Sequence, residues 1–186
     1  MAMVPTVGHV GEAHMFVEIT DIHRSVAQDA ADRASETIDR YGLCDSAGYR
    51  RHDRLPSWDG HYLGALAEII VSDATGLPWG QYDYGRVDVG DDIEVRRVQR
   101  PDTGPIIRPK DYADDRIRYH IAVYLPTDAG HAFVLGWCHT AQAWEHGHQC
   151  ATVSAGRCCY RFTDSNSVRI NPRHLRHIST LKGSDQ

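Results

Sequence analysis

The segment 86–98 constrains the fold most strongly, because two runs of alternating apolar residues flank a Gly-Asp-Asp turn. This pattern predicts a β-hairpin. In the register that the turn sets, Val89 faces Ile93 on the apolar side. On the other side, Asp88 faces Glu94. Like charges directly opposite each other destabilise a sheet, so either neighbouring arginines or a cation must compensate these two carboxylates.

Two interpretations of Asp88 and Glu94 follow. In the first, Arg86 and Arg96 neutralise them diagonally as surface ion pairs, each contributing at most about 1 kcal/mol. In the second, the two carboxylates and the backbone carbonyl of Val95 hold a divalent cation. Mg²⁺ suits such a site because it takes few protein carboxylates and keeps waters and phosphate as its other ligands.

The composition is that of a globular protein large enough to bury its own core. The chain has 186 residues, 41% of them hydrophobic and 24% charged, which predicts a single domain. Its formal net charge of −5 excludes a general polyanion binder, so binding of nucleic acid would need local basic clusters. We expect no membrane association, because no apolar run reaches membrane-spanning length and the N-terminus lacks a signal-peptide pattern. The 5 cysteines, an odd number with uneven spacing, fit a reducing, cytoplasmic compartment.

The rest of the chain alternates between helix and strand patterns. Nearly continuous apolar sequence predicts central strands, covered on both faces, at 119–125 and 132–137. The charged stretch 111–118 is predicted to be exposed. The expected order is an N-terminal leader, two helices, the hairpin, two central strands, a helix, and C-terminal short strands with a short helix: residues 1–20, 21–41, 62–75, 86–98, 119–125, 132–137, 140–146 and 148–186.

Glu68 is the polar exception within the apolar stretch 65–71 of the second predicted helix. It lies either at the edge of the apolar stripe or against a buried partner, because an ionised carboxylate cannot be buried unpaired without a heavy cost. A metal ion held by Asp88 and Glu94 would be such a partner.

With these elements in this order, the chain resembles the PD-(D/E)XK nuclease superfamily. The residues that carry the resemblance lie on the helix before the sheet, at the end of one strand and on the next strand: Glu68, Asp88, and Glu94-Val95-Arg96. The apolar strand from Ile121, and the strand 133–137 that leads into a helix, also match. The resemblance covers residues 62–147, and its motif is short and degenerate.

This resemblance implies an α/β fold with a restriction-endonuclease-like core, in which a central mixed β-sheet is flanked by helices. It also implies hydrolysis of DNA phosphodiester bonds with Mg²⁺ or Mn²⁺. Asp88 and Glu94 would hold the metal with the carbonyl of Val95, and Glu68 would be a further ligand, directly or through water. The metal would polarise the phosphate and activate a bound water. Small proteins of this superfamily often come from phages or mobile elements, and the resemblance extends that expectation here.

Arg96 stands where the superfamily usually has a lysine. An arginine can stabilise charge on a phosphate, but it cannot lose its proton to help activate water. Lys110 could take over that role, although nothing in the sequence places it near the acids. An alternative therefore stays open: a catalytically impaired relative that keeps the fold and binds nucleic acid or a protein partner.

Basic residues close to the carboxylates are the candidates for DNA contacts, because phosphate binding is local. The candidates in or just after the hairpin are Arg86, Arg97, Arg100, Arg108 and Lys110. Solvated surface charges would explain the same residues. The sequence leaves open whether the substrate is DNA or RNA, single- or double-stranded, and whether the chain forms a homodimer.

Cysteine and histidine are dense between residues 138 and 159, which raises zinc as a competing metal. The paired spacings typical of zinc sites are absent from this segment. Cys138 directly follows an apolar strand, so we expect it to be buried as a small apolar residue.

Overall fold

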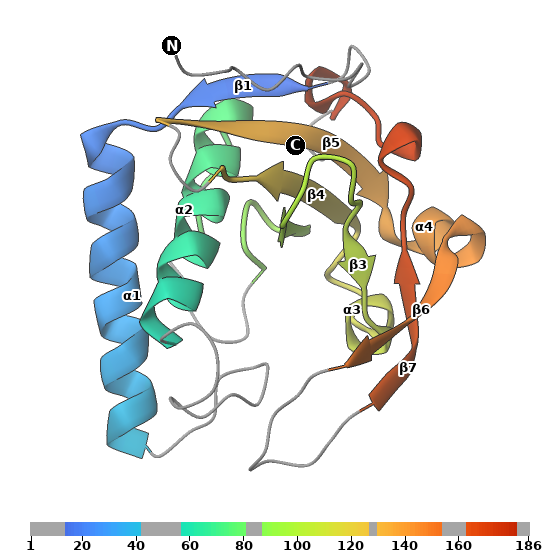
Figure 1. Ribbon diagram of the computed structural model, residues 1–186, viewed down its shortest axis with the longest axis horizontal. Coiled ribbons are helices and arrows are strands. Elements are labelled where there is room, and N and C mark those ends of the chain that lie inside the picture. The colour runs from blue at the N-terminus through green and yellow to red at the C-terminus, as the bar shows by residue number, and fades with distance from the viewer. Residues whose placement is uncertain (1–13, 42–56, 81–86, 127–129, 154–162, 182–186) are drawn as a thin grey trace, which may run out of the picture.

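A mixed β-sheet lies at the centre of the computed structural model, which describes residues 14–41, 57–80, 87–126, 130–153 and 163–181 (Figure 1). Among these residues the sheet has the strand order β1-β5-β4-β2. Both β1 and β4 pair antiparallel with β5, and β2 pairs parallel with β4. The strands are β1 (Met15–Glu18), β2 (Ile93–Val98), β4 (Tyr119–Tyr124) and β5 (His131–His139). The prediction of an α/β protein with a central mixed sheet is confirmed.

Two long helices, α1 (Asp21–Tyr41) and α2 (Ser57–Thr75), cover one face of this sheet (Figure 1). Alanines at 27, 30, 31 and 34 of α1 are buried, and such small side chains let the two helices pack closely. The predicted end of α2 is confirmed, since Gly76 follows it with φ +71°, a conformation that glycine adopts without steric cost. The helix begins at Ser57, before the predicted start at Tyr62.

The other face is covered by a second sheet and two short helices, α3 (Pro109–Ala113) and α4 (Thr140–His146). In this sheet β3 (Ile106–Ile107) and β6 (His148–Val153) both pair antiparallel with β7 (Thr163–Arg169). Side chains of the two sheets and α4 meet in an apolar core between them, formed by Val98, Ile107, Ala122, Leu135, Cys138, Ala143, Val168, Ile170 and Leu175. Figure 1 shows α1 and α2 on one side of the central strands and β3, α3, β6 and β7 on the other.

Three sequence predictions differ from the structure. Part of the predicted leader forms β1, which pairs with β5 and is therefore an edge strand of the central sheet. The stretch 111–118 is not uniformly exposed, because its first residue, Asp111, is buried in α3. Two short 3-10 turns, η1 (Pro172–His174) and η2 (Ile178–Thr180), replace the final helix.

No helix within the described ranges combines the length and the apolarity needed to cross a lipid bilayer.

Candidate functional site

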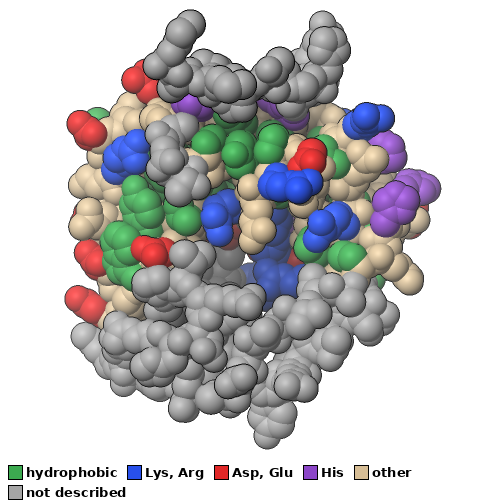
Figure 2. Space-filling model, in the orientation of Figure 1, with side chains coloured by type: hydrophobic (Ala, Val, Ile, Leu, Met, Phe, Trp, Pro, Cys, Tyr) green, Lys and Arg blue, Asp and Glu red, His purple; other side chains and the backbone are tan. Residues whose placement is uncertain are grey.

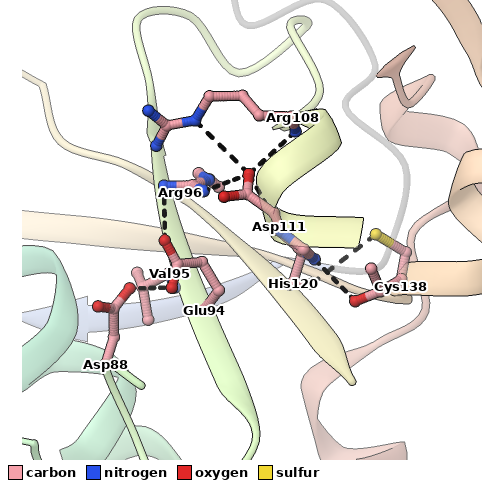
Figure 3. A network of polar contacts seen from close by, with 9 residues as sticks. Asp88, Glu94, Val95, Arg96, Arg108, Asp111, His120 and Cys138 are labelled. Carbon is pink, nitrogen blue, oxygen red and sulfur yellow. Dashed lines mark hydrogen bonds and ion pairs between the residues drawn. The ribbon is translucent and has the colours of Figure 1, made fainter. Parts of the chain in front are cut away.

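The free edge of β2 brings Asp88 next to the strand that carries Glu94. β2 pairs on one side with β4, and on its other side the backbone N–H of Val95 donates a hydrogen bond to Asp88 Oδ2 at 2.7 Å (Figure 3). The predicted pairing of Val89 with Ile93 is confirmed, but residues 87–89 form no strand, so the predicted hairpin is reduced to this turn and β2. Beyond that pair, the carboxylate of Asp88 takes the place of a backbone acceptor, so Asp88 lies beside the edge of β2 rather than across from Glu94.

The backbone carbonyl of Val95 belongs to the same edge. In a strand, the N–H and C=O of one residue point to the same side. Because the N–H of Val95 points to Asp88, its carbonyl also points away from β4. The carbonyl oxygen of Val95 and the carboxylate of Asp88 therefore both lie at the edge of β2 that faces away from β4.

Glu68 reaches this edge from α2. Its side chain is buried, with a relative exposure of 7%, and its Oε2 accepts a hydrogen bond from Trp79 Nε1 at 2.9 Å. Burial raises the pKa of Glu68 well above its usual value, and the negative charges of Asp88 and Glu94 raise it further, against the hydrogen bond from Trp79. Glu68 is therefore a buried acid within electrostatic range of both other carboxylates.

The pKa of Asp88 is raised to about 7, first by burial and then by the charge of Glu94. The hydrogen bond from Val95 and the charge of Arg96 act in the opposite direction without balancing this rise. The charge of Glu94 thus disfavours ionisation of both Glu68 and Asp88, which come from other segments. The predicted convergence of the three acids on one metal stays a prediction.

Arg96 lies on β2 between two carboxylates. Its Nη1 is 2.7 Å from Glu94 Oε1, and its Nη2 is 2.5 Å from Asp111 Oδ2 (Figure 3). Burial lowers the pKa of this guanidinium, but the charges of Glu94, Asp111 and Asp88 outweigh burial and hold it above its usual value. The first interpretation placed Arg96 diagonally against Asp88; the structure instead pairs Arg96 with Glu94, two residues earlier on the same strand.

Asp111 is the principal site residue that the sequence reasoning missed. Asp111 is 2% exposed, and its carboxylate contacts Arg96, the backbone N–H of Arg108 at 2.9 Å and Arg108 Nε at 3.5 Å, with His120 Nε2 at 3.9 Å. Burial alone would raise its pKa, yet His120, Arg96 and Arg108 hold it far below the usual range. A signal was present, because Pro109 followed by an acid two residues later is typical of a helix N-terminus.

His120 extends this network into the protein interior. Its imidazole is fully buried, with Nε2 3.9 Å from Asp111 Oδ2 and Nδ1 3.0 Å from Thr140 Oγ1 (Figure 3). Burial lowers the pKa of His120, which favours the neutral ring. Because Thr140 is also buried, with 4% exposure, this aspartate–histidine–hydroxyl chain supports the packing and does not present a nucleophile to a substrate.

The predicted DNA-contacting residues are divided among different environments. Arg97 is exposed, and Arg100 is exposed in a surface pair with Asp102. Arg108 is partly buried against Asp111, and Lys110 is exposed next to it in α3. Arg86 lies outside the described residues. Figure 2 shows lysine and arginine side chains gathered around a hollow in the middle of one face, where Figure 1 places β3 and α3.

The position of Lys110 bears on the missing lysine. Burial and the positive charges of Arg108 and Arg96 lower the pKa of Lys110. The negative charge of Glu94 raises it, but less strongly. Lys110 therefore lies within electrostatic range of Asp111 and Glu94. The sequence alone did not reveal this proximity.

In their present positions, the described side chains form no complete metal site. No group of at least 3 His, Cys, Asp or Glu side chains within these ranges is arranged to hold a metal ion. This holds for the acid cluster and for the described part of the Cys/His-rich segment, where Cys138 is buried as predicted. Cys158 and Cys159 lie outside the described residues.

Comparison with known proteins adds no assignment. No family model, curated protein or solved structure matches this chain.

Proposed function

We propose that this protein is a Mg²⁺-dependent nuclease with a restriction-endonuclease-like core, which hydrolyses phosphodiester bonds in DNA. The observation that carries the proposal is the electrostatic proximity of the buried acids Glu68 and Asp88 to each other and to Glu94 of β2. Each acid comes from a different segment, and Glu68 and Asp88 have raised pKa values. Carboxylates are held together in this way at the cost of folding stability, which is typical of functional sites.

The charge balance of the cluster supports a cation. If all were ionised, the carboxylates of Glu68, Asp88, Glu94 and Asp111 would outnumber the cationic groups of Arg96, Arg108 and Lys110; without a metal, the raised pKa values of Glu68 and Asp88 favour their neutral forms instead. Asp111 takes up most of the arginine charge through its contacts with Arg96 and Arg108. The acids at the edge of β2 are left with less positive charge than they need, and a divalent cation would supply it.

The donor atoms fit a hard cation. Asp88 and Glu94 would offer carboxylate oxygens and Val95 a backbone carbonyl, and Glu68 would act through water. When bound, Mg²⁺ would polarise the scissile phosphate and lower the pKa of a water molecule. To join such a site, Glu94 would exchange its contact with Arg96 for the metal.

Arg96 would keep its place during that exchange, because Asp111 holds the other end of its guanidinium. The Nη1 that contacts Glu94 in the metal-free protein would then be free to donate to a phosphate oxygen. A guanidinium held beside the reacting group stabilises charge on the phosphate without itself moving a proton. Lys110 is placed to assist from α3.

Cleavage of supercoiled plasmid and of circular single-stranded DNA tests the proposal. We expect wild type to cut at least one of them with Mg²⁺ or Mn²⁺ and not with EDTA. Glu94→Ala should abolish cutting, whereas Glu145→Ala, which removes an exposed carboxylate on α4, should leave it unchanged. Cleavage that persists in Glu94→Ala, or that needs no metal, would refute the proposal.

A second function, a non-catalytic nucleic-acid-binding or partner-binding module, is favoured by one observation. Both terminal nitrogens of Arg96 are engaged, one by Glu94 and the other by Asp111. If Glu94 does not release Arg96 to a metal, the cluster is a structural ion-pair network. DNA binding that is insensitive to metal, without any cleavage, would favour this module.

A further inference from the structure

A second polar site lies on the same sheet face, beyond His120. Register pairs place Glu94 of β2 beside His120 of β4, and His120 beside Cys138 of β5, so the three residues form one row across the sheet. With neighbouring strands about 4.8 Å apart, the row spans roughly 10 Å. The buried side chains of His120 and Asp111 separate its two ends (Figure 3).

The Cys138 end of this row opens into a cavity of about 250 Å³, here called the histidine cavity. Its basic lining residues come from β5, α4, β6 and the segment around η1: His139, His146, His148, His174 and Arg176. The described residues that line it include no carboxylate, although the chain contains 25 acidic residues. Figure 2 shows histidine side chains gathered at the edge of the molecule where Figure 1 places α4.

The remaining lining of the histidine cavity divides into an apolar part and an amide part. Cys138, Ala143 and Ile170 contribute apolar surface from the core between the sheets. Gln142 and Asn171 contribute side-chain amides, which can donate and accept hydrogen bonds. An apolar surface combined with a few polar groups is typical of a small-ligand site.

Arg176 is held in place at the mouth of the cavity. Its backbone N–H and C=O both bond to Trp137, at 2.8 and 2.9 Å. Its guanidinium carbon lies 5.0 Å from the centre of the Trp137 ring, and Nη2 is 3.4 Å from Gln142 Oε1. None of these contacts neutralises its charge, so the charge remains available to an anion.

We propose that the histidine cavity binds one unpaired nucleotide of a nucleic-acid strand. Arg176 and the imidazoles contact its phosphate, the apolar surface receives the base, and the two amides face the edge of the base. The anionic character of the ligand rests on Arg176 and on the lack of carboxylates among the described lining residues, whereas its identity as a nucleotide of the substrate rests on the nuclease function proposed above. Because Cys138, which lines the cavity, is two strands from Glu94, the cavity would hold a neighbouring nucleotide rather than the scissile phosphate itself.

Fluorescence anisotropy with a labelled single-stranded oligonucleotide tests this proposal in EDTA, where a metal-dependent nuclease cannot cut. Arg176→Gln should weaken binding by about five- to tenfold and reduce the slope of log K against log salt by about 0.7, the value for one phosphate contact to a single strand. Arg173→Gln is the matched control, because Arg173 is exposed in η1 and does not line the cavity. Equal affinities for these two variants would overturn the proposal.

Arg176→Gln could lose affinity through misfolding, because Arg176 packs on Trp137. A second variant therefore tests the cavity at an exposed residue. His146 is highly exposed, so His146→Gln should fold normally and still weaken binding. Competition separates two sources of the ligand. A mononucleotide that displaces the oligonucleotide only at far higher concentration supports a site for a nucleotide within a strand, whereas equal potency overturns that part of the proposal and assigns a free nucleotide.

The cleavage assay keeps the two proposals distinguishable. If wild type shows no metal-dependent cleavage but Arg176→Gln loses affinity, the cavity assignment stands and the nuclease assignment fails. If wild type cleaves and Arg176→Gln binds like Arg173→Gln, only the cavity assignment fails.

Discussion

Asp88 and Asp111 are both mostly buried and both lie close to Arg96, yet their pKa values move in opposite directions. The pKa of Asp88 rises to about 7, and that of Asp111 falls far below its usual value. Burial acts in the same direction on both, so the neighbours decide the difference. Asp111 is contacted by the guanidinium groups of Arg96 and Arg108, whereas the carboxylate of Asp88 accepts the backbone N–H of Val95 and is influenced by the charge of Glu94.

This contrast separates a structural ion pair from a candidate metal ligand. A carboxylate whose charge is already matched by arginines gains little from a cation. A carboxylate that shares a buried edge with other acids gains a great deal. The same cluster thus contains a supporting half, around Asp111, and a half with unbalanced negative charge, around Asp88.

The largest effect is expected from the supporting half. Asp111→Asn should cost about 3–5 kcal/mol of unfolding free energy, because it removes the buried carboxylate that Arg96 and Arg108 share and leaves Arg96 with Glu94 alone. The matched control is Asp114→Asn, in an exposed pair with Arg116, which should cost at most about 1 kcal/mol. Urea unfolding at neutral pH measures both. Similar losses for the two variants would show that Asp111 is no more important than a surface acid.

Substitution of Asp88 should have the opposite sign. Because its folded pKa of about 7 lies above the ordinary value of 3.8, the folded protein holds a proton that the unfolded chain has lost between these pH values. The stability of the metal-free protein therefore falls as pH rises through this window. Asp88→Asn removes that loss, so it should be more stable than wild type by about 2–4 kcal/mol near pH 8, since each pKa unit is worth about 1.4 kcal/mol.

Thermal unfolding from about pH 4 to pH 8, in EDTA, checks this second prediction, and near pH 4 the advantage of Asp88→Asn should disappear. Asp111 changes the folding stability with pH in the opposite direction. Because the folded pKa of Asp111 is lowered, the stability that it provides is present above its ordinary pKa and is lost as pH falls below it. An Asp88→Asn variant that is less stable than wild type at pH 8 would contradict the contrast between the two acids.

Mn²⁺ should stabilise the folded protein through the unbalanced half alone. At a concentration about 100 times its Kd, a ligand adds about 2.7 kcal/mol to the free energy of unfolding. We expect this gain in wild type and in Glu145→Gln, and its loss in Glu94→Gln. Differential scanning calorimetry with and without Mn²⁺ makes the comparison. A gain retained in Glu94→Gln would place the metal elsewhere.

The smallest effect is expected at Trp79. Trp79→Phe keeps the ring but removes the hydrogen bond to Glu68, which should cost about 1 kcal/mol and raise the pKa of Glu68 further. Mn²⁺ affinity near pH 6 should fall more than near pH 8, because protons compete for the same acid. Isothermal titration calorimetry at both pH values measures this. The control variant Trp58→Phe removes a hydrogen bond to Asp32 on α1 and should leave the Mn²⁺ affinity unchanged at both pH values.

Much of the fold was accessible from local patterns. The strands β4 and β5 follow from nearly continuous apolar runs, and the end of α2 follows from Gly76. The three acids also stand out locally, since Glu68 interrupts an apolar stretch and Asp88 and Glu94 flank one turn. Each of these signals depends on neighbours within a few residues, which the sequence displays directly.

Other features needed elements that are distant in the chain. β1 carries no strong pattern of its own and becomes a strand because the edge of β5 is available to pair with it. Asp111 is buried because α3 packs against the sheet face that carries Arg96 and His120. The histidine cavity is lined by β5, α4, β6 and residues around η1, whose approach no local spacing encodes.

By itself, the sequence indicated the acids Glu68, Asp88 and Glu94 as candidates and located α1, α2, β4 and β5, but not β1 or the role of Asp111. The tertiary structure decided which of the acids is neutralised, by placing Arg108 and Arg96 against Asp111 and leaving Asp88 beside Glu94. The physical reason is that secondary structure depends on contacts between near neighbours, whereas the charge state of a buried acid depends on whatever the packing of distant segments brings next to it.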